Sequence, residues 1–248
     1  MKLKTPNTIE YLTPCEVEFS KNYIAVRNKE KRILSNREVS DIPKVVVNNI
    51  REWQFRKESS DRILNYLRSK NKPLKILDLG CGNGWLSNLM SQIENCTVIG
   101  IDINLIELEQ ANAVFHNDNL QFVYADIFKI TDIDYNNKFD IITLNGSVQY
   151  FSDLKKLLEK LNSFLSPMGA IHIFDSPFYR KNNIILAKKR TFNYYNELGY
   201  PEMSKFYFHH LLTDLEPNII LYQPTKSMLK FYKKQNPFCW FMIHKKLI

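Results

Sequence analysis

The chain has 248 residues, and 44% of them are hydrophobic, which is enough for a sizeable core in one large domain. No run of about 18 apolar residues occurs, so no transmembrane helix is predicted. The four cysteines are scattered without a CxxC pair, which argues against a zinc ribbon or a disulfide framework, and we expect no metal site. The first 14 residues lack the apolar core of a secretory signal, so we expect a cytoplasmic protein.

The net charge of +8 is unevenly placed along the chain. Residues 1–75 carry +8, residues 76–175 carry −8, and residues 176–248 carry +8. Basic ends suit an acidic substrate, an anionic membrane or RNA. Compositional drift is the alternative, because Lys, Asn and Ile are all abundant. The lysines are also spread singly, without the interleaved aromatic residues of a nucleic-acid platform.

Residues 1–45 are predicted to form a polar, irregular N-terminal extension. Apolar and polar residues alternate in EVEF (16–19) and NYIAV (22–26), on either side of Ser20–Asn22, which favours a β-hairpin. From about Val45 to Ser69 the apolar residues recur at helical spacing. We expect a helix there, with a break near Lys57–Ser60.

A regular alternation of strands and helices begins at residue 74. Apolar runs predict five strands, each followed by a helix or a crossover, at 74–79, 97–102, 120–125, 139–144 and 170–175. Two more strands are expected at 218–223 and 237–244, after an aromatic, partly helical stretch. Strands separated by helices form a parallel sheet with right-handed crossovers, so the sequence predicts a doubly wound α/β fold.

The turn after the first of these strands reads DLGCGNG (78–84). Three glycines at alternate positions exceed what a structural turn needs, and open parallel sheets bind ligands at the carboxyl ends of their strands. A dinucleotide site requires GxGxxG, but Trp85 and Ser87 stand where its last glycine would be. Asp78 would repel a pyrophosphate, whereas a carboxylate suits an ammonium or sulfonium group. The pattern therefore predicts a ligand other than a dinucleotide.

DLGCGNG resembles motif I of class I S-adenosylmethionine-dependent methyltransferases, an acidic residue followed by GxGxG. The resemblance extends from about Leu74 to Asp175. It implies a Rossmann-like, mostly parallel sheet of seven strands with the last strand antiparallel. It also implies S-adenosyl-L-methionine as the cofactor and methyl transfer as the activity. Residues 46–248 would be the methyltransferase domain, with a helical, aromatic lid inserted at about 177–216.

The resemblance also assigns cofactor contacts at successive strand ends. Asp102 in VIGIDIN would accept hydrogen bonds from the ribose hydroxyls, because a carboxylate can take both at once. Asp126 in YADIF would bind the adenine amino group, while Ile127 lies against the ring. The expected cofactor-binding residues in this region are Asp78, Gly80, Cys81, Gly82, Asn83, Gly84, Asp102, Ile103, Asp126, Ile127, Asn145 and Gly146, the last two facing the methionine part.

Two further candidates lie in EWQFRKES (52–59), before the first strand of the alternation. In similar enzymes this helix lies across the cofactor, so Trp53 would cover it and Arg56 would pair with its carboxylate. The alternative is an amphipathic helix with Trp53 in the core and Arg56 in solvent.

The acceptor is less defined. NGSV (145–148) replaces the NPPY-like motif of adenine and glutamine-amide methyltransferases, and no Pro-Cys of the cytosine-C5 kind follows the fourth strand. Candidates for the acceptor pocket are Tyr150, Asp175, Phe178 and Tyr179. Candidates for catalysis are Tyr150, His209 and His210, with one histidine as a general base, although a lone histidine is more often at the surface or in a satisfied core.

We expect methyl transfer to an oxygen or nitrogen atom of a small-molecule acceptor. One alternative is an RNA or protein methyltransferase that uses the basic ends. Another is a non-catalytic cofactor-binding or dehydrogenase-like module.

Overall fold

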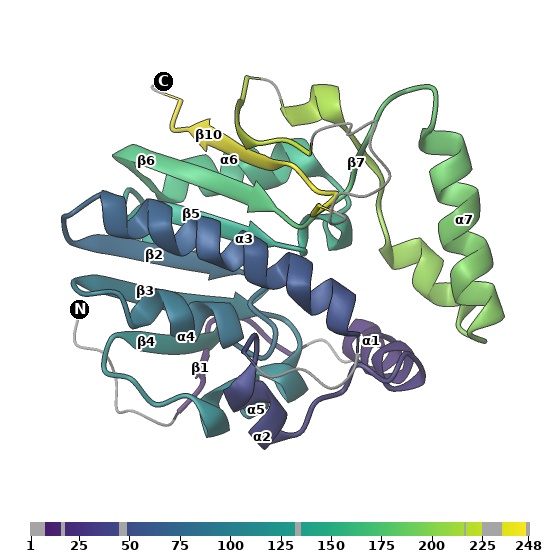
Figure 1. The fold of residues 1–248 in the computed structure, drawn as a ribbon, viewed down its shortest axis with the longest axis horizontal. Coiled ribbons are helices and arrows are strands. Elements are labelled where there is room, and N and C mark those ends of the chain that lie inside the picture. Colours follow the sequence, from purple (N-terminus) through teal and green to yellow (C-terminus); the bar gives the residue numbers. More distant parts are fainter. Residues whose placement is uncertain are drawn as a thin grey trace.

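A computed structural model describes residues 8–15, 18–44, 49–131, 135–215, 217–224 and 235–246. In these residues an eight-stranded sheet forms the centre of the molecule, with helices on both faces (Figure 1). Its strand order is β1-β4-β3-β2-β5-β6-β10-β9. The bounds are β1 (Glu10–Tyr11), β2 (Leu74–Leu79), β3 (Cys96–Asp102), β4 (Leu120–Tyr124), β5 (Phe139–Asn145), β6 (Leu165–Phe174), β9 (Ile219–Tyr222) and β10 (Trp240–His244).

The predicted fold class is confirmed. Strands β1 to β6 pair in parallel, and β10 runs antiparallel to both β6 and β9. All seven predicted strands are present, and the sheet has an eighth, β1, which pairs with the free edge of β4. Strand β1 was not predicted, because two residues flanked by polar ones give no alternating pattern.

Each face of the sheet carries its own apolar core. Side chains alternate along a strand, so in β2 Ile76 packs on one face and Leu77 on the other. The Ile76 face is covered by α3 (Ile50–Ser69) and α4 (Trp85–Ser91), and the Leu77 face by α6 (Leu154–Phe164). Helix α5 (Leu105–Val114) packs against β4 through a smaller cluster that contains Leu108 and Phe122.

The break predicted within the helix near Lys57–Ser60 is wrong, because α3 is continuous from Ile50 to Ser69. Ser59 and Ser60 are buried rather than exposed. The Ser60 hydroxyl donates to the Lys57 carbonyl, and the Ser59 hydroxyl donates to Asp175 at the end of β6. The polar residues that suggested a break are therefore hydrogen-bonded on the packed side of the helix.

The β-hairpin predicted in the N-terminal extension is also wrong. Residues 18–29 form α1 (Glu18–Lys29), while residues 16–17 lie outside the described part of the chain. The apolar residues Tyr23 and Val26 share one helical face, which packs against Tyr195 and Met203. This distant contact favours the helix over the local two-residue alternation. A second short helix, α2 (Asn36–Asp41), begins with a capping box between Ser35 and Glu38.

The segment after β6 is helical and aromatic, as expected. It contains β7 (Phe178–Tyr179), α7 (Ile184–Glu197), η3 (Pro201–Phe206), β8 (His210–Leu211) and η4 (Leu212–Leu215). Figure 1 places α1 and α7 on the same side of the molecule, beyond the carboxyl ends of the central strands. Within the described residues, no helix is both long and apolar enough to span a membrane.

Candidate functional site

The glycine turn between β2 and α4 is tightly packed by the protein itself. Gly80 and Gly84 both have φ of 74°, in the left-handed region. A Cβ at Gly80 would lie 2.4 Å from the Cβ of Ser147, and a Cβ at Gly84 would lie 2.5 Å from the Cζ of Phe122. Close packing therefore accounts for these two glycines without any ligand.

Asp78 is buried under the turn and binds two hydroxyl groups. Its Oδ2 accepts a hydrogen bond from the Ser87 hydroxyl at 2.6 Å, and its Oδ1 accepts one from the Thr143 hydroxyl at 2.8 Å. Burial raises the pKa of the Asp78 carboxyl to about 6, against the opposing effect of these bonds. The Asp78 side chain thus links β2 to α4 and to β5.

Asp102 holds the glycine turn from the end of β3. Its Oδ2 accepts a hydrogen bond from the Gly82 amide at 2.8 Å, and its Oδ1 accepts one from the Asn104 amide at 2.8 Å. Burial raises the pKa of the Asp102 carboxyl, and these backbone bonds oppose the rise. Each oxygen keeps a further lone pair for a ligand.

Two cavities adjoin the turn. The glycine-loop cavity, of about 100 Å³, runs along the turn towards α3, and the β3–β4 cavity, of about 330 Å³, lies at the ends of those strands. The predicted residues that line the glycine-loop cavity are Trp53, Arg56, Asp78, Gly80, Cys81, Gly82, Asn83, Asn145 and Gly146. Those that line the β3–β4 cavity are Gly80, Gly82, Asp102, Ile103, Asp126, Ile127 and Gly146.

Gly84 lines neither of these cavities, because it faces Phe122 and Ala111. Gly84 thus has a packing role in the turn, and its contact with the cofactor stays a prediction. The other predicted cofactor residues converge on the two cavities although they come from five different segments of the chain.

Two roles were open for Trp53 and Arg56: contact with the cofactor, or an amphipathic helix with Trp53 in the core and Arg56 in solvent. The structure agrees with each of them in part. Trp53 is half-buried and packs edge to face on Trp85, with ring centroids 5.5 Å apart, yet it also lines the glycine-loop cavity. Arg56 is half-buried rather than in solvent, and its Nε and Nη2 donate to Glu52 at 3.1 and 3.0 Å. The guanidinium group lies 5.5 Å from the Trp53 ring centroid.

A third and larger cavity, of about 660 Å³, lies between the glycine-loop cavity and α7. We name it the tyrosine cavity after the six tyrosines that line it: Tyr23, Tyr150, Tyr179, Tyr194, Tyr195 and Tyr207. Gly146 and Tyr23 line all three cavities. The three spaces therefore meet at the end of β5, under α1.

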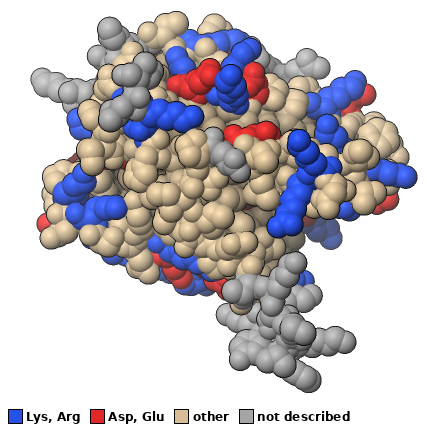
Figure 2. Space-filling view, turned by 90° about the horizontal axis from the view of Figure 1, so that it is seen from above, with Lys and Arg blue, Asp and Glu red and all other residues tan. Residues whose placement is uncertain are grey.

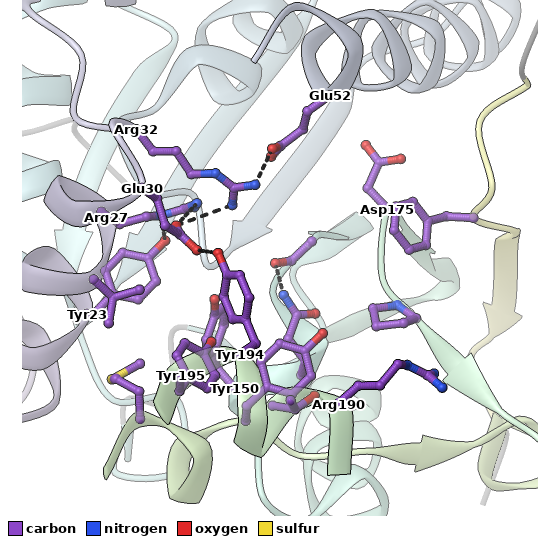
Figure 3. Close-up of a pocket in the computed structure, with 18 of the residues that line it drawn as sticks. Tyr23, Arg27, Glu30, Arg32, Glu52, Tyr150, Asp175, Arg190, Tyr194 and Tyr195 are labelled. Carbon is purple, nitrogen blue, oxygen red and sulfur yellow. Dashed lines mark hydrogen bonds and ion pairs between the residues drawn. The ribbon is translucent and has the colours of Figure 1, made fainter. Parts of the chain in front are cut away.

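The charged groups of the tyrosine cavity are mostly paired. Figure 3 shows Arg27, Arg32 and Tyr194 converging on Glu30. Arg32 also donates to Glu52 at 2.5 Å, and Arg27 donates through Nε to the Tyr23 oxygen at 2.9 Å.

Tyr23, Arg27, Glu30 and Arg32 belong to the N-terminal extension, and no motif in the sequence predicts a role for them. The spacing of Tyr23 and Val26 is compatible with a helix, but the alternation at period two in the same residues favours a strand. What α1 packs against, at positions more than a hundred residues away, could not be read locally.

Three of the four predicted acceptor-pocket residues line the tyrosine cavity: Tyr150, Asp175 and Tyr179. Phe178 does not. Its ring packs edge to face on Phe241, with centroids 5.4 Å apart, and belongs to the core. The alternation of side chains in β7 places Tyr179 towards the cavity and Phe178 away from it.

The two histidines predicted as catalytic candidates, His209 and His210, line none of the three cavities. The His209 ring packs behind Tyr179 and Tyr207 and hydrogen-bonds to the Thr191 hydroxyl at 2.9 Å. His210 is buried, with its Nε2 at 3.3 Å from the Val148 carbonyl. Burial lowers the pKa of both histidines. The geometry does not support either as the general base.

Comparisons with known proteins identify the family. A family model described as a methyltransferase domain matches residues 70–216. A malonyl-[acyl-carrier protein] O-methyltransferase from Acetivibrio thermocellus is 30% identical over 120 residues, which are 48% of this chain and 41% of that one. A ubiquinone biosynthesis O-methyltransferase from Actinobacillus pleuropneumoniae is 29% identical over 116 residues, 44% of this chain and 49% of that one. The match spans less than half the length of each relative.

Solved structures share the fold. The plantazolicin methyltransferase BpumL, in complex with a pentazolic desmethylPZN analog and SAH, has a TM-score of 0.55 at 18% identity and covers 93% of this chain and 98% of its own. A putative O-methyltransferase from Nostoc punctiforme has a TM-score of 0.50 at 15% identity, with 92% and 71% covered. The chain belongs to the class I S-adenosylmethionine-dependent methyltransferases.

Proposed function

We propose that this protein transfers the methyl group of S-adenosylmethionine to an oxygen or nitrogen atom of a small-molecule acceptor held in the tyrosine cavity. The observation that carries the proposal is the meeting of the three cavities at Gly146 and Tyr23. Methyl transfer is an in-line displacement, so the acceptor atom must reach the sulfonium from the far side of the methyl group. A cofactor in the two smaller cavities would be reached from the tyrosine cavity at this junction.

The residues around the smaller cavities fit the cofactor. Asn145 lines the glycine-loop cavity, and its buried Oδ1 has no hydrogen-bond partner in the described part of the chain. A buried acceptor without a partner is costly, and an ammonium group would satisfy it. Asp102 and Asp126 offer carboxylates to the ribose and adenine from the β3–β4 cavity.

When bound, the cofactor supplies a methyl group already activated by the sulfonium, so the protein has chiefly to orient the acceptor and exclude water. Gly146 leaves the junction of the cavities open, and Tyr23 covers it from α1. Burial raises the pKa of Tyr150, so its phenol stays protonated at neutral pH. Tyr150 is thus suited to donate a hydrogen bond to the acceptor rather than to take its proton.

The size of the site and the scattered basic residues on one face of the molecule favour a small acceptor over RNA. A volume of about 660 Å³ lies within the usual range of small-molecule sites. On the face in Figure 2, Lys and Arg side chains lie in separate groups divided by other residues, not in a continuous band. Continuous basic tracks are what a nucleic-acid backbone requires.

The proposal is tested with radiolabelled S-adenosylmethionine and a cell extract separated into small-molecule, RNA and protein fractions. Label should enter the small-molecule fraction with the wild-type protein and be lost with Asp102→Ala. Label in the RNA or protein fraction alone would contradict the acceptor class. No transfer to any fraction by a wild-type protein that binds the cofactor would support a non-catalytic module.

A further inference from the structure

We infer that Glu107 is a second carboxylate for the ribose hydroxyls of the cofactor and acts beside Asp102. The inference deepens the proposed function, since it rests on cofactor binding in the two smaller cavities. Glu107 lies in the first turn of α5, five residues after Asp102.

The two carboxylates flank the same glycine. The Gly82 amide donates to Asp102 at 2.8 Å, and a Cβ at Gly82 would lie 3.1 Å from the Oε2 of Glu107. Asp102 lines only the β3–β4 cavity, whereas Glu107 lines that cavity and the glycine-loop cavity as well. The Glu107 side chain therefore stands where the two cavities adjoin, which is the position of a ribose between an adenine and an amino-acid part.

The Glu107 carboxylate has no hydrogen bond or ion pair within the described residues, although it is half-buried. Burial raises its pKa to about 7, and Asp102 adds to the rise, while Arg27 and Arg56 oppose it. A carboxylate held in this way is costly in the empty protein unless a ligand satisfies it. Each Asp102 oxygen already accepts a hydrogen bond from a backbone amide, which uses part of its capacity. A second carboxylate would provide further acceptors for the ribose hydroxyls.

Two other roles make different predictions. A carboxylate that serves only to offset the charge of Arg27 would not alter cofactor affinity by a direct contact. A carboxylate that binds the α-ammonium group would recognise the amino-acid part and not the ribose. 5′-Methylthioadenosine separates these roles, because it keeps the nucleoside and lacks the amino-acid part.

Calorimetric titration with S-adenosylhomocysteine and with methylthioadenosine tests the inference on wild type, Glu107→Ala and Glu107→Gln. The control is Glu109→Ala, since Glu109 is exposed on the same helix and lines none of the cavities. Loss of a hydrogen bond to a charged group should weaken both ligands by about tenfold in Glu107→Ala. Glu107→Gln, which keeps one acceptor oxygen, should lose less, and the control should match wild type.

Unchanged affinity of Glu107→Ala for both ligands would overturn the inference and leave the proposed function standing. Weaker binding of S-adenosylhomocysteine with unchanged binding of methylthioadenosine would also overturn the inference, in favour of a contact between Glu107 and the ammonium group. A wild-type protein that binds neither ligand would remove the proposed function itself. If Glu107→Ala fails to fold, as judged by circular dichroism, the comparison of Glu107→Gln with wild type decides.

Discussion

The rings of Tyr23 and Tyr150 pack edge to face, with centroids 5.6 Å apart and planes at 84°. Tyr23 comes from α1, and Tyr150 ends η2 (Val148–Tyr150), the short helix after β5. Both side chains line the tyrosine cavity and the β3–β4 cavity. The contact makes the N-terminal extension a wall of the site and not an appendage of the domain.

Replacing Tyr23 with Ala should lower kcat/KM for methyl transfer by about tenfold, because the side chain that covers the junction of the cavities and helps to position the acceptor is lost. Tyr23→Phe keeps the ring and loses the hydrogen bond that the Tyr23 oxygen accepts from Arg27, so it should retain most activity. Tyr11→Ala is the control, since Tyr11 lies in the same extension but is 52% exposed and lines none of the cavities. Equal activities of Tyr23→Ala and the control would show that α1 does not take part in the site.

If Arg56 binds the cofactor carboxylate, Arg56→Ala should lower the affinity for S-adenosylhomocysteine, which carries that carboxylate. The affinity for methylthioadenosine, which lacks it, should not change. Arg62→Ala is the matched control on α3, because Arg62 pairs with Glu58 at 3.6 Å and lies outside the cavities. Calorimetry gives both affinities. The carboxylate assignment fails if the two ligands weaken equally or if neither changes.

Gly84→Ala should lower the free energy of unfolding by about 3 kcal/mol, because the new Cβ would overlap Phe122 and the backbone is left-handed. Gly199→Ala should cost about 1 kcal/mol, since its φ of 85° is also left-handed but nothing lies within 4 Å. Urea unfolding measures both. Similar losses would mean that backbone strain alone, and not packing on Phe122, requires glycine at position 84.

Glu107→Gln should stabilise the ligand-free protein at pH 8. The folded pKa of about 7 lies above the ordinary value of 4.5, so the folded protein holds a proton that the unfolded chain has released. In wild type this residue therefore lowers stability as the pH rises from about 4.5 to about 7, and no further above that. The gain from Glu107→Gln should be small near pH 4 and largest above pH 7.

Thermal unfolding across this pH range checks the prediction, with Glu109→Gln as the exposed control. A gain that does not vary with pH would contradict the raised pKa. A gain in stability combined with weaker cofactor binding is what a residue kept for binding, at a cost in stability, should show.

The sheet and the glycine turn were predictable because their signals are local. Ile76 and Leu77 lie in an apolar run long enough for a buried strand, and the turn follows it at once. The strand ends then placed Asp102 and Asp126 at one edge of the sheet without any knowledge of packing.

The tyrosine cavity was harder to predict, because its wall is built from contacts between distant segments. Tyr23 packs where it does because Tyr150 and the α7–η3 region lie nearby. His210 and Phe178 carry the residue types of an acceptor site, but the pairing of β7 with β8 sets them opposite each other and away from the cavity. Residue type alone did not distinguish Tyr179, which lines the cavity, from Phe178, which does not.

The most direct test of cofactor binding is a calorimetric titration of the wild-type protein and Asp102→Ala with S-adenosylhomocysteine, alongside NAD. The account predicts that the wild type binds S-adenosylhomocysteine and not NAD, and that Asp102→Ala binds it at least about tenfold more weakly, since it loses a charged hydrogen-bond acceptor. Binding of NAD without S-adenosylhomocysteine would contradict the account, and unchanged affinity in Asp102→Ala would remove the ribose assignment.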